Sequence, residues 1–395
     1  MARGMVSGLN PDAKQKLKGW INIVEDPNKN QGLYENIRLF AARPKGLNLP
    51  TPQVAEGTEQ IKKMLLECDP DDLVVGLFSG GGSALLESPI PPMTMEHIIA
   101  VTTELTRSGA SIQQLNCVRK ALSHVKGGKL TRFSKSRFVH SLYISDILGG
   151  ELADIASGPT VPHSNMTTTA ALDIINQMIS NPSDRVSEIA TWLKQTQEEE
   201  YADDTATFNG QTRNELVASN AQAVQAAQSC ASVMGYQLLD ASILNVVGSV
   251  EELADQLADQ IVEAVKMNAR VALITGCEPT IRAQFLGDGG RNQHLVLCVL
   301  NRVLDQIKTD AFQFCLLSGG TDGEDGNSTA SGGYIDDHLL GQVTPDASKR
   351  AALEQAISTH SSHEFLSEFS RVFYSGETKT NVADLVILIV EPNVP

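Results

Sequence analysis

The chain has 395 residues, of which 42% are hydrophobic and 20% charged, and its formal net charge is −16. This composition is typical of a globular protein long enough for two domains. The negative charge argues against a nucleic acid or an anionic membrane as partner, because either needs a basic protein face. No apolar run approaches the roughly 18 residues that span a bilayer, and the opening sequence MARGMVSGLNPDAKQ lacks the apolar core of a signal peptide.

The six cysteines are single and far apart, without a CxxC pair or a Cys/His pair at metal-ligand spacing. This usage fits a reducing compartment, so we expect a cytoplasmic protein. Any anionic substrate of so acidic a chain needs a local basic site.

Short apolar runs alternate with longer segments of helical period, which favours a mostly parallel sheet wrapped by helices. Strands are expected at residues 73–78, 139–146, 215–220, 271–276, 312–319 and 385–390. Helices are expected at 95–107, 115–130, 167–178, 183–195, 221–234, 250–267 and 292–307, with Asn220 capping the helix 221–234. We place the domain boundary after that helix, which gives domains 1–234 and 235–395.

Three of the expected strands end in the same way, in the sequences LFSGGGS, LITGCEPT and LLSGGTDGEDGNS. Ligands bind at the carboxyl ends of parallel strands, and glycine lets an anion approach the backbone N–H groups. The turn Ser79–Gly80–Gly81–Gly82–Ser83 is therefore predicted to hold an anion, the alternative being a tight turn needed only for packing. It matches neither the GxGxxG nor the GxxxxGK[ST] nucleotide motif.

Charged residues near these turns are the next candidates. Arg291 opens a helix after two glycines, where it could bind a phosphate or carboxylate beside free backbone N–H groups. Asp322 and Asp325 lie on a glycine-rich turn without the spacing of an EF-hand, which favours Mg²⁺ bound to a nucleotide over Ca²⁺. A solvated acidic turn is the alternative. Asp146 ends a buried strand, where it could hold a metal, accept a hydroxyl proton or cap a turn.

Eight sequence blocks occur in the order found in the glycerate 2-kinase family, and the chain resembles that family over most of its length. The blocks are LFSGGGSALLESPIPP, LNCVRKALSHVKGGKL, SDILGGELADIASGPT, VASNAQAV, GCEPT, GDGGRNQHL, SGGTDGEDGNSTASGG and GETKTNVADL.

The resemblance implies an α/β protein with a Rossmann-like amino-terminal domain and a smaller MOFRL-like α/β domain across a cleft. It also implies ATP-dependent, Mg²⁺-assisted phosphorylation of D-glycerate to 2-phosphoglycerate, with a homodimer as an open possibility. The residues carried over for catalysis are Arg291, Asp146 and Asp322, and those for the metal are Asp322 and Asp325. Binding of substrate or nucleotide is carried over to Ser79, Gly80, Gly81, Gly82, Ser83, Arg119, Glu278, Gly290, Asn292, Gly320 and Thr321.

The chain also departs from the family pattern. The family has a glycine turn with a lysine well before the triple-glycine block, and no such turn precedes Leu73 here. The resemblance therefore implies that the sequence begins inside the first βα unit, and an upstream extension could carry a mitochondrial address. Cys277 replaces a glycine, and Lys379 could partly replace the missing lysine. The hypotheses are a working glycerate kinase, a catalytically impaired truncated form, and a hydroxypyruvate or glycerate oxidoreductase, against which the missing GxGxxG motif counts.

Overall fold

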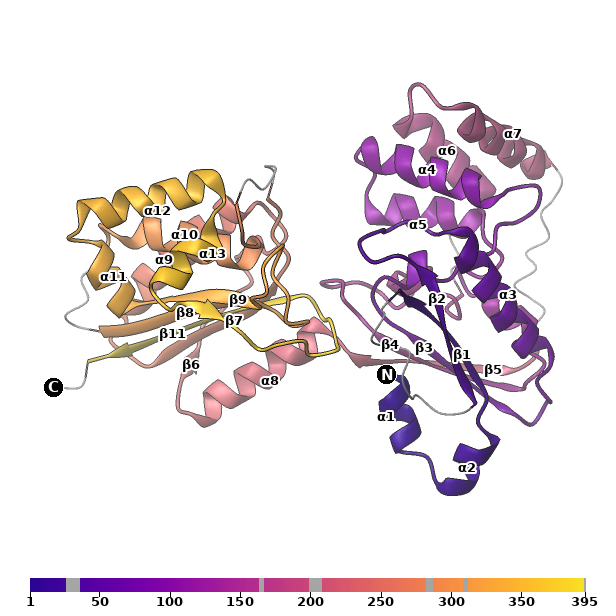
Figure 1. The fold of residues 1–395 in the computed structure, drawn as a ribbon, viewed down its shortest axis with the longest axis horizontal. Coiled ribbons are helices and arrows are strands. Elements are labelled where there is room, and N and C mark those ends of the chain that lie inside the picture. Colours follow the sequence, from indigo (N-terminus) through magenta and orange to yellow (C-terminus); the bar gives the residue numbers. More distant parts are fainter. Residues whose placement is uncertain (26–35, 163–166, 199–207, 282–286, 308–311, 394–395) are drawn as a thin grey trace. The chain divides into compact units, whose positions relative to one another are not determined.

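The structure, a computed structural model, describes residues 1–25, 36–162, 167–198, 208–281, 287–307 and 312–393. Its internal contacts form two compact units (Figure 1). The first unit contains Met1–Ile144 and Gly150–Val217, and the second contains Ser145–Gly149 and Ala218–Pro395. The expected α/β class and the presence of two domains are confirmed. None of the helices in the described ranges combines the length and apolar character needed to cross a membrane.

The first unit begins with a small sheet that the sequence did not predict. Helices α1 (Ala2–Ser7) and α2 (Pro11–Lys16) precede two parallel strands, β1 (Gly19–Val24) and β2 (Ile37–Arg43), and helix α3 (Pro52–Leu66) packs on them. All six residues of β1 are half-buried, so the strand lacks the alternation of buried and exposed positions that reveals a strand in sequence. Asn22 Nδ2 donates to Leu85 O over 2.8 Å, which ties this sheet to the turn that follows β3.

The second sheet of this unit has the order β3–β4–β5, with β3 at Leu73–Phe78, β4 at Phe138–Ile144 and β5 at Gln211–Ala218. Strands β3 and β4 are parallel. A layer of four helices contributes the apolar core: α4 (Met95–Arg107), α5 (Ile112–Ala121), α6 (Thr168–Met178) and α7 (Asp184–Glu198) (Figure 1). Three short 3₁₀ turns, η1 (Gly82–Ala84), η2 (Lys129–Phe133) and η3 (Ile155–Ser157), complete the unit.

The helix expected at 115–130 ends at Ala121. Tertiary hydrogen bonds replace the next helical turns: His124 N donates to Ser88 O, and Gly127 N and Gly128 N donate to the carbonyls of residues 157 and 158. Both glycines have positive φ, 63° and 86°. The helical spacing of apolar residues continues past Ala121, but the backbone N–H groups there donate to carbonyls outside the helix.

The second unit is built on one six-stranded mixed sheet of order β10–β9–β8–β11–β7–β6. Its strands are β6 (Gln237–Leu238), β7 (Val271–Cys277), β8 (Phe312–Gly320), β9 (Gly332–Asp336), β10 (Val372–Phe373) and β11 (Asp384–Pro392). Because β11 is antiparallel to both β7 and β8, these two strands run in the same direction without being neighbours. Their carboxyl ends and the amino end of β11 therefore meet at one edge of the sheet.

Helices cover both faces of this sheet (Figure 1). One face carries α8 (Asn220–Val233), and the other carries α9 (Val250–Lys266), α10 (Arg291–Val303) and α12 (Ala347–Thr359). Helices α11 (Asp337–Val343) and α13 (Ser362–Glu368) flank them. Helix α10 is the centre of the larger core, since every residue from Asn292 to Leu300 is buried.

The start of α8 differs from the expectation. Ser219, not Asn220, is the N-cap, and its side chain accepts from Gln222 N. Asn220 is the first helical residue, and its Nδ2 donates to Val382 O (2.8 Å) and Asp384 O (3.0 Å). These bonds attach α8 to the start of β11, so α8 belongs to the second unit. The boundary between the two units therefore lies before this helix, between Val217 and Ala218, whereas the sequence suggested a boundary after it.

Candidate functional site

Charged side chains gather where β7 and β8 end and β11 begins. Asp384, the first residue of β11, pairs in register with Cys277 on one side and Gly320 on the other. Gly320 must lack a side chain, because a Cβ there would lie 2.6 Å from Glu324 O and 2.9 Å from Asp322 Oδ1. Asp384 Oδ1 is 3.5 Å from the same position. The carboxylates of Asp322 and Asp384 therefore approach the same point of the sheet edge.

Arg291 is the cation of this cluster. Its Nε donates to Asp384 Oδ2 over 2.6 Å, and its Nη1 lies 3.5 Å from Glu278 Oε1. The Arg291 side chain is one-third exposed and Asp384 is nearly buried. The arginine is thus fixed along one edge by carboxylates. Its Nη2 donates to no side chain of the described residues, so it can donate to an incoming oxyanion.

Two further carboxylates at this edge have perturbed pKa values. Burial raises the pKa of Glu278 above its ordinary value, the Arg291 charge opposes that rise, and the negative charges of Asp384 and Asp146 add to it. Burial also raises the pKa of Asp146, which a backbone hydrogen bond partly offsets. The Asp146 charge thus acts on the pKa of Glu278, although the two residues lie far apart in sequence.

Asp325 faces the start of α10. Its two oxygens accept from Asn292 N and Nδ2 (3.1 and 3.2 Å) and from Gln293 N and Nε2 (2.9 Å each). Burial raises the pKa of this carboxyl, and the hydrogen bonds from Gln293 and from Asn292 N oppose that rise. Gly290 is required beside it, because a Cβ there would lie 2.1 Å from Asp325 Oδ1. These contacts make Asp325 a helix cap and give its expected metal role no support.

The cap also corrects the expectation about the start of α10. The N–H groups of Asn292 and Gln293 were expected to be free for an anion, but Asp325 uses them. Asn292 is buried, and its Oδ1 accepts from Ser318 Oγ over 2.5 Å. Gly290 and Asn292 thus hold α10 in place, and their expected contact with a ligand stays a prediction.

Thr321 and Asp322 support the loop that leads into β11. Thr321 Oγ1 donates to Ala383 O over 2.6 Å and accepts from Val382 N over 2.8 Å. Asp322 Oδ1 accepts from Glu324 N (3.0 Å), and its Oδ2 accepts from Asn381 Nδ2 (3.1 Å). Each Asp322 oxygen keeps a free lone pair, so this half-buried carboxylate can still bind a cation. Lys379, in the same loop, is exposed.

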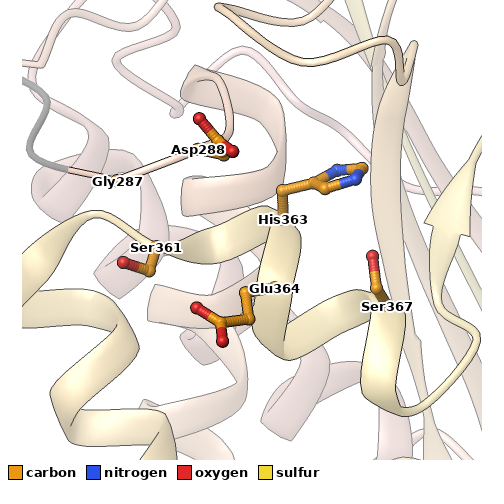
Figure 2. Close-up of a pocket in the computed structure, with 6 residues that line it drawn as sticks. All are labelled: Gly287, Asp288, Ser361, His363, Glu364 and Ser367. Carbon is orange, nitrogen blue, oxygen red and sulfur yellow. The ribbon is translucent and has the colours of Figure 1, made fainter.

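A cavity of this unit lies elsewhere, around the start of α13. It has a volume of about 500 Å³ and is lined by Gly287, Asp288, Ser361, His363, Glu364 and Ser367 (Figure 2). His363 is linked to the helix cap, since its Nδ1 lies 2.8 Å from Gln293 Oε1. The lining includes none of the residues expected to act on a substrate, so we do not place the reaction there.

In the first unit, the glycine turn after β3 is held by unusual backbone geometry. Gly81 has a φ of 74°, and a Cβ on Gly82 would lie 2.7 Å from Ala156 Cβ. The opposing turn has positive φ at Ala156, Ser157 and Gly158. Ser83 Oγ lies 2.9 Å from Ser157 Oγ. The close approach of Gly82 to Ala156 fits a role in packing. Such backbone strain is concentrated at functional sites, so the geometry also fits a role in binding.

A buried lysine contacts the same turn, and two further cations lie on helix α5. Lys126 is completely buried, and its Nζ donates to Ser83 O and Leu86 O over 2.8 Å each, with Glu87 Oε2 at 3.6 Å. Arg119 donates from Nε to Thr102 Oγ1 over 3.4 Å. Burial lowers its pKa and the Glu87 charge opposes that change. Lys120 is buried as well.

The structure thus brings together Arg291, Glu278, Gly320 and Asp322 in the second unit, which also contains Asp146, and it places Ser79–Ser83 and Arg119 in the first. Sequence reasoning missed Asp384, whose only signal is an acidic residue at the start of an apolar strand. It also missed Arg43 at the end of β2.

Two family profiles match the chain, one largely within each of the two units. The profile described as a domain of unknown function (DUF4147) matches residues 1–193, and that of the MOFRL family matches residues 271–384. Glycerate kinase of Macaca fascicularis is 33% identical over 387 residues, covering 87% of this chain and 96% of the relative. Glycerate 2-kinase of Pyrococcus horikoshii is 30% identical, covering 91% of this chain and 80% of the relative.

A solved structure agrees. The crystal structure of glycerate kinase from Thermotoga maritima is 28% identical, with a TM-score of 0.77, and the match covers 94% of this chain and 85% of that one. The fold and these similarities identify an α/β protein of the kinase class. This chain belongs to the glycerate kinase family, in which a DUF4147 region is combined with a MOFRL domain. The resemblance seen in the sequence is confirmed.

Proposed function

We propose that this chain is a glycerate 2-kinase, which transfers the terminal phosphoryl group of ATP to the 2-hydroxyl of D-glycerate. The observation that carries the proposal is the cluster of Arg291, Glu278, Asp384 and Asp322 at the edge of the MOFRL sheet. Phosphoryl transfer depends on positioning and charge neutralisation more than on covalent chemistry. An arginine held by two carboxylates beside a third one suits that task.

Arg291 is proposed to bind the substrate through its unused Nη2. Asp384 fixes the guanidinium through Nε, so that little side-chain entropy is lost when an oxyanion binds. A carboxylate or a phosphoryl group offers the paired oxygen atoms that a guanidinium recognises.

Asp322 is proposed to hold Mg²⁺. The fit rests on its two oxygens, each of which accepts a single hydrogen bond and retains acceptor capacity. Mg²⁺ takes one or two protein carboxylates together with water and phosphate oxygens. When bound, the ion would neutralise phosphate charge. Asp325 is left out of this proposal because all of its contacts are donors of α10.

Asp146 is proposed to accept the proton of the reacting hydroxyl. Burial raises its pKa, and only the ionised form accepts a proton. We therefore expect the acidic limb of kcat/KM against pH to lie above the ordinary aspartate pKa of about 3.9. Activity rises with pH through that limb.

The measurement is a pH profile of this chain beside Asp146→Asn. The substitution is expected to lower kcat by about 10² to 10⁴ and to remove the limb. An Asp146→Asn variant that keeps both its rate and the limb would exclude Asp146 as the proton acceptor. Glu278→Gln is the matched variant, since the pKa of Glu278 is also raised.

The proposed function is tested by coupled assay of ATP consumption with D-glycerate, followed by NMR identification of the product. Formation of 2-phosphoglycerate supports the proposal, and 3-phosphoglycerate would correct the position of transfer. An NAD-dependent absorbance change with glycerate or hydroxypyruvate in the absence of ATP would favour the oxidoreductase. Consumption of neither ATP nor NADH would contradict the proposed activity.

A further inference from the structure

Arg43 is a buried arginine beside the glycine turn of the first unit. It ends strand β2 and is only 7% exposed. Its Nη1 donates to Leu47 O and to Asn48 Oδ1, the latter over 2.8 Å. Its Nη2 lies 3.8 Å from the position that a Cβ on Gly81 would occupy. One edge of the guanidinium therefore supports its own loop, and the other faces the glycine turn.

The Arg43 charge has no carboxylate partner among the described residues, unlike the charges of Arg371 and Arg350. These two arginines lie 2.9 Å from Asp336 and 2.8 Å from Asp305, respectively. Arg43 Nε is also buried without an acceptor in the described part of the chain. A buried cation normally has both a counter-ion and a full set of acceptors, because losing hydration is costly. An arginine keeps its charge even where burial lowers its pKa.

The neighbouring turn offers donors of the right kind. Gly81 has a φ of 74°, and the N–H groups of Gly80 and Gly81 enter no backbone hydrogen bond within the described ranges. The hydrogen bond from Asn22 to Leu85 O holds the sheet that carries Arg43 against this turn. Unused guanidinium and backbone N–H donors thus lie side by side, which is a complement to a tetrahedral oxyanion.

We propose that Arg43 and the glycine turn, residues 79–83, form a binding site for a phosphoryl group, with Arg43 Nε and Nη2 as its charged donors. The site itself is argued from the contacts of the first unit. Only the identity of the molecule that carries the phosphoryl group, the nucleotide or the phosphorylated product, rests on the proposed function.

The test is calorimetric titration of the full chain with three probes, namely ADP, 2-phosphoglycerate and inorganic phosphate. Arg43→Gln is expected to weaken phosphoryl binding by about 10-fold to 100-fold, the loss typical of hydrogen bonds to a charged group. The probe whose affinity falls most identifies the carrier. Arg43→Lys keeps the charge without the planar fork and should bind more tightly than the glutamine variant. Arg38→Gln, on the exposed side of the same strand, is the matched control and should bind as the unaltered chain does.

A structural role would give a different result, because Arg43 also supports Leu47 and Asn48. Thermal unfolding is therefore measured with and without each probe. The proposal predicts that the probe raises the Tm of the unaltered chain and of Arg38→Gln but not that of Arg43→Gln. A lower Tm for Arg43→Gln without ligand, combined with unchanged affinity for all three probes, would overturn the site. Binding without turnover would count against the proposed function alone, because no probe has to react.

Discussion

Replacing Arg291 with methionine is expected to lower kcat/KM for glycerate phosphorylation by about 10² to 10³, the usual effect of removing one preorganised donor to developing charge. The reason is local: Arg291 is the cation held by Asp384 and Glu278 at the sheet edge, and its remaining donor edge is open to substrate. Arg291→Lys should recover only part of the rate, because the ammonium group cannot bind both Asp384 and a substrate through a planar fork.

Two controls separate catalysis from folding in this experiment. Arg291→Met leaves the nearly buried Asp384 unpaired, so it should also lower stability. The double variant Arg291→Met with Asp384→Asn removes that unpaired charge and should recover stability without recovering activity. Arg302→Met, in the last turn of the same helix, alters an ion pair with Asp255 and should leave kcat/KM nearly unchanged. Full activity of Arg291→Met would remove the proposed site from the sheet edge.

Replacing Asp325 with alanine is expected to lower the free energy of unfolding of the chain by about 3–5 kcal/mol, because it leaves the buried donors of Asn292 and Gln293 without an acceptor. The measurement is urea denaturation followed through the MOFRL unit. Asp346→Ala is the matched control, since Asp346 caps α12 in a more exposed setting and accepts from Ser348 N and Lys349 N. Its loss should cost only about 1 kcal/mol.

The Asp325→Ala variant also distinguishes a helix cap from a metal ligand. A cap acts whether or not a metal is present, so the stability lost by Asp325→Ala should be equal in EDTA and in Mg²⁺. A loss that occurs only in Mg²⁺ would return Asp325 to the metal ligands. Asp322→Ala is expected to behave in the opposite way, with little effect on unfolding and a higher Mg²⁺ requirement for activity.

Much of the fold could be predicted from sequence because apolar periodicity directly reflects burial. The bounds expected for Leu73–Phe78 and Met95–Arg107 are those of β3 and α4. The helix expected at 115–130 failed because periodicity does not reveal that backbone donors such as His124 N bond to a distant strand-like segment. Strand β1 was missed because its residues are all half-buried.

The candidate site was only partly predictable, for a related reason. Arg291 and Glu278 stand in recognisable glycine-rich blocks, whereas Asp384 reaches Arg291 across 93 positions and has no local motif. The sequence of the acidic turn does not reveal which of its carboxylates faces α10, so Asp325 was interpreted as a metal ligand. Arg43 has no motif either, and only its burial without a counter-ion singles it out.

The central place of β11 has a consequence for how the protein is made. Strands β7 and β8 leave the ribosome long before β11, which separates them in the finished sheet. Until then both expose unpaired edges, a state prone to association with other nascent chains. Asp384 arrives with the same strand, so the polypeptide cannot acquire its arginine–carboxylate pair before nearly the whole MOFRL segment has been translated. Biogenesis of this enzyme should accordingly depend on chaperone protection late in synthesis.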